Sequence, residues 1–239
     1  MKAVVFDVDG TLAESERDGH RVAFNDAFAR LGLPYHWDAG TYRRLLAITG
    51  GRRRIAHYLR ERADAADVAV RVHAVKTGIV RAMAAEGRIP LRPGVRPLVA
   101  ALGAAGIRLF VATTGDRAWV EPLLAAHFPP GTFETVLTGT DVPRLKPEPD
   151  VYLAVVERAA LDPRQTVAVE DSANGVRAAR AAGLPCLAVR NDFNPEDLSD
   201  ADASVTAFGP DAAHLAGVPL PLPGGRVTPE TLATLCATP

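Results

Sequence analysis

The chain has 239 residues, 48% of them hydrophobic, which is enough for a core of ordinary size with a smaller inserted domain. Its formal net charge of −1 argues against nucleic-acid binding, and its two cysteines, Cys186 and Cys236, are too few for a disulfide framework. Residues 1–12 have the pattern of a strand and a turn rather than of a secretory leader, and no segment of this sequence approaches an uninterrupted apolar run of about 18 residues. We therefore expect a cytoplasmic protein that does not bind membranes.

The first predicted element is a buried strand over residues 2–6, which is apolar and β-branched and ends at Asp7 in a turn led by Asp9-Gly10. Asp7 can ligate a hard cation and attack an electrophile there, while Asp9 can carry a proton. An ordinary Asp-Gly turn is the structural alternative. The longer pattern Asp-x-Asp-Gly-Thr directly after a strand is rare by chance and favours the functional interpretation.

From Leu12 to about residue 89 the apolar residues recur with a helical period. Four helices are predicted in this part of the chain, around 22–31, 45–48, 55–59 and 68–83. They would form a small helical bundle inserted after the first strand. We therefore expect a helical cap domain over residues 15–89 and a core made of residues 1–14 and 90–239.

From Pro90 onward, apolar runs alternate with helical patterns, which is typical of an α/β domain with a parallel sheet. The predicted strands cover 107–112, 135–137, 166–169, 185–189 and 204–207. The predicted helices cover 94–105, 117–127, 149–160 and 172–182. Residues 218–225 are predicted to form an extended surface segment, and 228–236 a short helix that packs on the core.

Polar residues follow several of these strands, at the edge of a parallel sheet where ligands gather. They are Thr113 and Thr114 after the second strand, Lys146 after the third, and Glu170 with Asp171 after the fourth. Each has a structural alternative as a turn, cap or solvated residue. Taken together with Asp7 and Asp9, they would combine a nucleophile, an acid that carries a proton, groups that bind phosphate oxygens and a carboxylate metal site.

Four segments in this order resemble the four motifs of the haloacid dehalogenase superfamily. They are Phe6-Asp7-Val8-Asp9-Gly10-Thr11, Thr113, Lys146-Pro147 and Glu170-Asp171-Ser172-Ala173-Asn174-Gly175. The resemblance spans residues 2 to about 190 and implies the superfamily's Rossmann-like parallel sheet flanked by helices.

The same resemblance implies a role for each motif residue. Asp7 would be the nucleophile that becomes an aspartyl phosphate, and Asp9 the general acid and base. Thr113 and Lys146 would bind the phosphoryl group. Mg²⁺ would be held by Asp7, the Asp9 carbonyl and Asp171, with Glu170 supporting its waters. An oxygen-ligand site of this kind suits Mg²⁺ better than zinc.

The predicted cap resembles that of the β-phosphoglucomutase-like branch. Its segments 12–25 and Thr49-Gly50-Gly51-Arg52 are similar to the CbbY-type phosphatases, which convert xylulose 1,5-bisphosphate to xylulose 5-phosphate. A second phosphate on the substrate requires a second anion site, which amides at a helix start and guanidinium groups could provide. The residues expected to bind substrate are Glu16, His20, Tyr42, Gly50, Gly51, Arg52, Arg53, Lys76, Thr114 and Asn174.

Structural alternatives remain open for this cap set. A triple-arginine run is often a solvated face, because Arg52, Arg53 and Arg54 cannot all face one way on a helix. Arg52 also stands where a lysine often follows the two glycines, so a forked cation replaces a point charge and the substrate range is open.

The leading hypothesis is a Mg²⁺-dependent sugar-phosphate phosphatase that acts through an aspartyl phosphate, with xylulose 1,5-bisphosphate as its substrate. A phosphosugar mutase, a broad sugar-monophosphate phosphatase and a non-catalytic binding protein are the alternatives. The expected partner is a small phosphorylated sugar, not nucleic acid or a membrane, and the expected state is a monomer.

Overall fold

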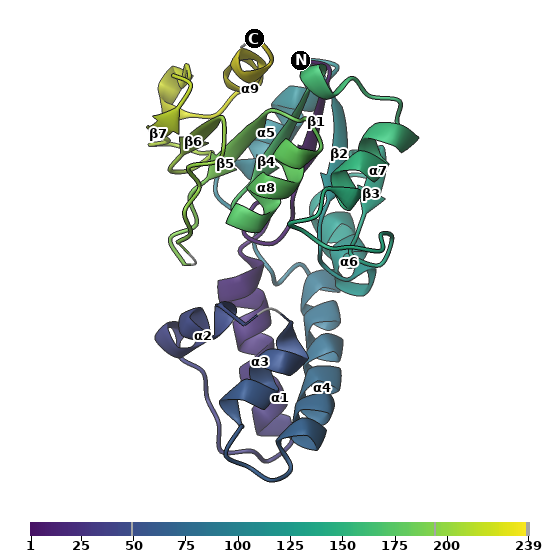
Figure 1. The fold of residues 1–239 in the computed structure, drawn as a ribbon, viewed down its shortest axis with the longest axis vertical. Coiled ribbons are helices and arrows are strands. Elements are labelled where there is room, and N and C mark those ends of the chain that lie inside the picture. The colour runs from purple at the N-terminus through teal and green to yellow at the C-terminus, as the bar shows by residue number, and fades with distance from the viewer. Residues whose placement is uncertain (49, 194, 238–239) are drawn as a thin grey trace.

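The computed structural model describes residues 1–48, 50–193 and 195–237, so Thr49 of the predicted cap motif lies outside the described residues. Figure 1 shows a sheet with flanking helices above and a group of helices below, joined by two chain segments. Among the described residues, every helix is too short or too polar to cross a bilayer.

The described residues include one seven-stranded sheet in the order β3-β2-β1-β4-β5-β6-β7. Its strands are β1 (Ala3–Phe6), β2 (Arg108–Ala112), β3 (Thr135–Leu137), β4 (Thr166–Glu170), β5 (Cys186–Val189), β6 (Ala203–Val205) and β7 (His214–Gly217). Every neighbouring pair is parallel except β6 and β7. This sheet with its flanking helices confirms the predicted α/β fold.

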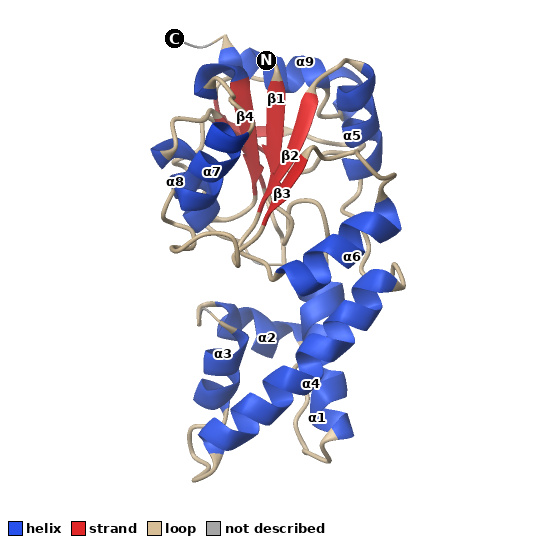
Figure 2. Ribbon diagram, turned by 90° about the vertical axis from the view of Figure 1, so that its right-hand side faces the viewer, coloured by secondary structure: helices blue, strands red, loops and turns tan. Residues whose placement is uncertain are grey.

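Helices cover both faces of the sheet. They are α5 (Val95–Ala104), α6 (Arg117–His127), α7 (Asp150–Arg158), α8 (Ala173–Ala181) and α9 (Pro229–Cys236). Figure 2 shows α7 and α8 on one side of the strands and α5 on the other. Successive side chains of a strand point to opposite faces of the sheet. In β1, Ala3 and Val5 pack with residues of α7 and α8, whereas Val4 and Phe6 pack with those of α5.

The lower group of helices is built around a long helix, α4 (Ala65–Ala85). The others are the π-helix η1 (Ser15–His20), α1 (Arg21–Arg30), α2 (Ala39–Leu46) and α3 (Gly51–Tyr58). A buried cluster of Phe24, Phe28, Trp37 and Tyr42 holds them together. Besides α1 and α3, α4 also contacts α6 of the core (Figure 2).

The two segments that join cap and core run side by side as a short ribbon. The Glu14 amide donates to the Pro90 carbonyl at 2.9 Å, and Ala13 forms an antiparallel bridge with Leu91. Two chain segments that are hydrogen-bonded to each other move together. Any motion of the cap must therefore bend both segments of this ribbon at once.

Arg92 fixes the core end of the ribbon. Its amide donates to the Leu12 carbonyl at 2.9 Å, and its buried guanidinium donates to the carbonyls of Gly10 at 2.5 Å and Arg190 at 2.7 Å. One side chain thus ties the turn after β1 to the loop after β5.

Two elements differ from the sequence predictions. Helix α2 begins at Ala39, well before the predicted 45–48, because the Asp38 carboxylate caps it by accepting from the Thr41 amide at 2.6 Å. Strand β7 was not predicted, since all of its residues are exposed and so lack the apolar alternation of a buried strand.

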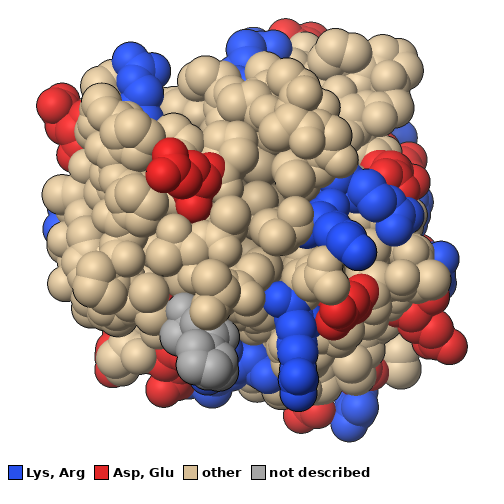
Figure 3. Space-filling view, turned by 90° about the horizontal axis from the view of Figure 1, so that it is seen from above, with Lys and Arg blue, Asp and Glu red and all other residues tan. Residues whose placement is uncertain are grey.

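Basic and acidic side chains are interspersed on the face of the core seen in Figure 3, which is the end farthest from the cap. This mixture matches the formal net charge of −1. Electrostatic selection of an anionic ligand must therefore come from a local arrangement of charges.

Candidate active site

The turn after β1 lies between the ends of β2 and β4. Phe6 pairs with Val111 on one side and with Val169 on the other, so all three strands end together. Asp7, Thr113 and Asp171 follow these strands directly and are all buried. The parallel register therefore gathers residues from distant parts of the chain at one edge of the sheet.

Lys146 supplies the positive charge at this edge. Its ammonium lies 2.6 Å from Asp7 Oδ1 and 2.5 Å from Glu170 Oε1, and it donates to the Ala112 carbonyl at 2.9 Å. The Tyr152 hydroxyl donates to the same Glu170 oxygen at 2.7 Å. These contacts fix the Asp7 carboxylate in one orientation.

The buried carboxylates outnumber the lysine. Oxygen atoms of Asp7, Glu170 and Asp171 lie within 4.8 Å of one another. Burial raises the pKa of Asp7 well above its ordinary value, and the attraction of Lys146 does not cancel this rise. Burial, followed by the charge of Glu170, raises the pKa of Asp171 to about 8. A site with this excess of negative charge favours an added cation.

The donor set fits Mg²⁺. It consists of carboxylate oxygens, with Gly10 close to those of Asp171, and hard divalent cations prefer such ligands. Asp171 is held by the Thr11 hydroxyl at 3.3 Å and by the Asn191 amide at 2.8 Å. Asp7, Asp171 and Glu170 could therefore hold the ion without rearrangement of the strands.

Gly10 allows the turn to approach Asp171. Its φ of 77° lies in the left-handed region, and a Cβ atom there would collide with the Asp171 carboxylate and the Asn191 amide. The absence of a side chain at this position is thus a condition for the metal site.

Gly10→Ala should weaken Mg²⁺ binding by at least about tenfold, since strain and the collision together displace Asp171. The measurement is the Mg²⁺ dissociation constant, obtained from the dependence of the melting temperature on Mg²⁺ concentration. Gly32→Ala is the matched control, because Gly32 also has a positive φ but has open space around it. If both variants bound Mg²⁺ equally well, the collision would have no effect on the site.

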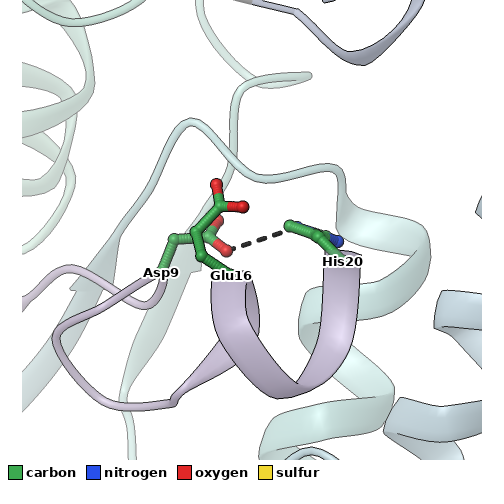
Figure 4. Close-up of side chains that lie close together, drawn as sticks. All are labelled: Asp9, Glu16 and His20. Carbon is green, nitrogen blue, oxygen red and sulfur yellow. Dashed lines mark ion pairs between the residues drawn. The ribbon is translucent and has the colours of Figure 1, made fainter. Parts of the chain in front are cut away.

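Asp9 faces the cap rather than the lysine. The Ser15 hydroxyl donates to Asp9 Oδ1 at 2.5 Å, and His20 Nε2 lies 3.3 Å from the same oxygen. Glu16 lies close to both Asp9 and His20 (Figure 4). Burial raises the pKa of Asp9, but the contacts with His20 and Ser15 outweigh it and leave the pKa below its ordinary value.

A cavity of about 320 Å³ lies between the cap and the core. Its core side is formed by Asp9, Thr114, Gly115, Asp116 and Trp119. Its cap side is formed by Glu16, His20, Phe24, Gly50, Gly51, Arg54, His73, Lys76, Thr77 and Val80. The wall therefore carries both acids, Asp9, Glu16 and Asp116, and the cations Arg54 and Lys76, which suits a polar ligand.

The structure brings several of the predicted substrate-binding residues to this cavity: Glu16, His20, Gly50, Gly51, Lys76 and Thr114. Tyr42 is fully buried in the cap behind Glu16, to which its hydroxyl donates at 2.5 Å. Asn174 lies on the surface, where it accepts from Arg177 at 2.6 Å.

Of the three consecutive arginines, the one that lines the cavity is not among the two expected to bind substrate, Arg52 and Arg53. Arg52 and Arg53 are exposed, whereas Arg54 is buried and lines the cavity. Successive residues on a helix are rotated by about 100°, so only one of three neighbours can face a given wall. The Arg54 guanidinium is fixed by donating to the Leu45 carbonyl and the Tyr42 hydroxyl, both at 3.0 Å.

Sequence reasoning missed other residues of the site. Asn191 stands two positions after β5, so the strand-end rule that identified Asp171 could have found it. Ser15, His73 and Trp119 occupy helical or linker positions that carry no such signal. Their positions depend on how the cap sits on the core.

Comparisons with known proteins agree with the geometry. The family model of the haloacid dehalogenase-like hydrolases matches residues 1–183. The plasmid-encoded protein CbbY of Cupriavidus necator is 44% identical over 207 residues, covering 82% of this chain and 81% of that protein. A phosphoglycolate phosphatase of Shigella boydii is 33% identical over 219 residues, covering 84% of this chain and 85% of that protein.

A solved structure is similar over most of the chain. It is a variant of CbbY from Rhodobacter sphaeroides in complex with xylulose-(1,5)-bisphosphate, with a TM-score of 0.73 and 41% identity. The match covers 87% of this chain and 94% of that chain. These findings confirm the resemblance to the haloacid dehalogenase superfamily and to CbbY-type proteins.

Proposed function

Since the chain belongs to the haloacid dehalogenase-like hydrolase family and is a phosphoric monoester hydrolase, we propose that it removes one phosphate from xylulose 1,5-bisphosphate. The product would be xylulose 5-phosphate. The observation that carries this proposal is the cavity with carboxylate chemistry at Asp9 and two buried cations, Arg54 and Lys76, on its cap side. A substrate with two phosphates uses both parts of such a cavity, and the similar CbbY structure holds a bisphosphate.

The first step of the proposed reaction transfers the phosphoryl group to the protein. An Asp7 oxygen attacks phosphorus, the bond to the sugar oxygen breaks, and Asp9 gives its proton to the leaving oxygen. Lys146 lies beside Asp7 and opposes the rise in its pKa that burial causes, which favours the ionised, nucleophilic form. The pKa of Asp9 is low in the free protein, and an arriving phosphate dianion would raise it and so promote uptake of that proton.

The second step restores the protein. Asp9 removes a proton from a water molecule, which attacks the phosphorus of the Asp7 phosphate and releases inorganic phosphate. In this proposal Lys146, which lies beside Asp7, and the Thr113 hydroxyl hold the phosphoryl oxygens in both steps. Mg²⁺ held by Asp7, Asp171 and the Asp9 carbonyl, with Glu170 in support, would supply further positive charge to those oxygens.

The second phosphate would bind on the cap. Gly50 precedes the first turn of α3, where main-chain amides point outward, and Arg54 lies one turn further along. Lys76 of α4 lines the same cavity. In this proposal Arg54 takes the part expected of Arg52 and Arg53, while Glu16 and His20 bind sugar hydroxyls.

A phosphate-release screen tests the proposal. Purified protein with Mg²⁺ is given xylulose 1,5-bisphosphate and a panel of sugar monophosphates, and kcat/KM is expected to be highest for the bisphosphate. Equal values across the panel would indicate a broad monophosphatase. Formation of glucose 6-phosphate from β-glucose 1-phosphate with a trace of glucose 1,6-bisphosphate would instead indicate a mutase.

Lys76 should give substrate binding a pH dependence. Burial lowers its pKa from 10.5 to about 8, although Glu16 and Asp9 act in the opposite direction. Because the pKa of this base is lowered, Lys76 is a cation below about pH 8 and loses its charge above it. We expect kcat/KM for the bisphosphate to fall about tenfold as the pH rises from about 7 to about 9.

Two variants identify the group responsible. Lys76→Arg keeps a cation at all these pH values and should remove the fall, and Lys76→Met should have a low kcat/KM that no longer falls in this range. The exposed Lys2 provides the control, since Lys2→Met should behave as the wild type. An unchanged pH profile in Lys76→Met would assign the titration to another group.

A further inference from the structure

The loop after β5 makes a second contact between core and cap. Phe193 in this loop stacks on Tyr42 of α2, with ring centroids 6.1 Å apart and planes at 29°. The Arg43 guanidinium lies 5.6 Å from the Phe193 ring. Figure 1 shows this loop extending from the sheet toward α2, while α4 meets α6 elsewhere. Among the described residues, the cap thus contacts the core at this loop as well as at α6.

On the core side, Phe193 is connected to the metal-site carboxylate. Its amide donates to Asn191 Oδ1 at 3.0 Å, and Asn191 Nδ2 donates to Asp171 Oδ2 at 2.8 Å. Phe193 and Asn191 are both buried. The position of the Phe193 ring is therefore fixed relative to the catalytic edge of the sheet.

On the cap side, Tyr42 is connected to the cavity. Its hydroxyl donates to Glu16 Oε2 at 2.5 Å and accepts from Arg54 Nη1 at 3.0 Å. Glu16 and Arg54 both line the cavity. A displacement of the Tyr42 ring would therefore move the acid and the cation that face the substrate.

We propose that Phe193 is a positioning residue, which docks the cap through Tyr42 and so holds Glu16 and Arg54 where they meet the sugar and its second phosphate. The proposal rests on the proposed function for the identity of the substrate. Phe193 does not line the cavity, and of its two cap neighbours, Tyr42 and Arg43, Tyr42 contacts the cavity residues Glu16 and Arg54. Its effect should appear in binding of a substrate that reaches the cap.

Phe193→Ala should raise KM for xylulose 1,5-bisphosphate roughly threefold to tenfold, the range expected when one aromatic pair is lost. The kcat value and the KM for p-nitrophenyl phosphate, which has no second phosphate, should stay near those of the wild type. Phe193→Tyr keeps the stack and should restore KM. Leu215→Ala, at an exposed position on β7, is the control and should change nothing. An unchanged KM in Phe193→Ala, or an equal rise for both substrates, overturns the proposal.

A double-mutant cycle tests the route through Tyr42. Tyr42→Phe keeps the ring and removes the hydroxyl that contacts Glu16 and Arg54. If Phe193 acts through that hydroxyl, Phe193→Ala should raise KM less in the Tyr42→Phe background than in the wild type. Fully additive effects would show that Phe193 acts by another route, contrary to the proposal.

Solution scattering separates this proposal from the proposed function. With Mg²⁺ and inorganic phosphate, Phe193→Ala should have a larger radius of gyration than the wild type, since the contact of the cap with the loop after β5 is lost. If the wild type hydrolysed no sugar bisphosphate while the variant expanded, the function would fail and the docking role would stand. Equal radii would refute the docking role whatever the substrate.

Discussion

Asp7→Asn should lower kcat by at least about 10⁴-fold, because a carboxamide cannot form the aspartyl phosphate on which both steps depend. The protein should still fold, since burial raises the pKa of Asp7 and a neutral side chain of the same shape suits that environment. The measurements are phosphate release under saturating substrate and Mg²⁺, and the melting temperature without Mg²⁺.

A matched variant distinguishes loss of the nucleophile from a general effect of removing a negative charge on kcat. Asp197→Asn removes a carboxylate from an exposed position of the core and should leave kcat unchanged. If Asp7→Asn kept more than about one hundredth of the wild-type kcat, the nucleophile would have to be another group.

Lys146→Met should lower the free energy of unfolding by about 3 kcal/mol at pH 8, because it leaves the Asp7 and Glu170 carboxylates buried without their cation. Activity should be lost as well, since the phosphoryl group loses its charged partner. The measurement is urea unfolding of the variant and of the wild type without Mg²⁺.

The stability loss in Lys146→Met should depend on pH and on Mg²⁺. Burial raises the folded-state pKa of Asp7 and raises that of Asp171 to about 8, above the values in the unfolded chain. The folded state therefore takes up protons as the pH falls from 8, so the loss should be smaller at pH 6 than at pH 8. Saturating Mg²⁺ should also reduce it, because the ion supplies the missing positive charge.

The surface residue Lys2 again provides the control, and Lys2→Met should unfold as the wild type does at both pH values. A loss in Lys146→Met that was the same at pH 6 and pH 8, with and without Mg²⁺, would contradict the proposed charge balance. The loss of stability would then come only from the packing of the aliphatic part of the Lys146 side chain.

Most of the core fold could be predicted from the sequence because each strand carries its own signal. Strands β1, β2, β4 and β5 are apolar runs buried on both faces, and they appear where the runs predict them. The exposed strand β7 and the early start of α2 escaped prediction, since neither depends on burial of an apolar face.

The sequence by itself determined which residues meet at the proposed catalytic edge. Asp7, Thr113 and the pair Glu170-Asp171 follow predicted strands, and parallel pairing brings strand ends together whatever the details of packing. The order of these residues along the chain was enough to suggest phosphoryl chemistry and a hard-metal site.

Only the tertiary structure decided how the cap meets that edge. It selected Arg54 rather than Arg52 or Arg53 for the cavity, and it placed Tyr42 between Glu16 and the Phe193 ring. The physical reason is that the rotation of each cap helix, and the docking of segments far apart in the chain, follow from packing of the whole molecule. Local sequence patterns show where strands end, but they carry no information on this packing.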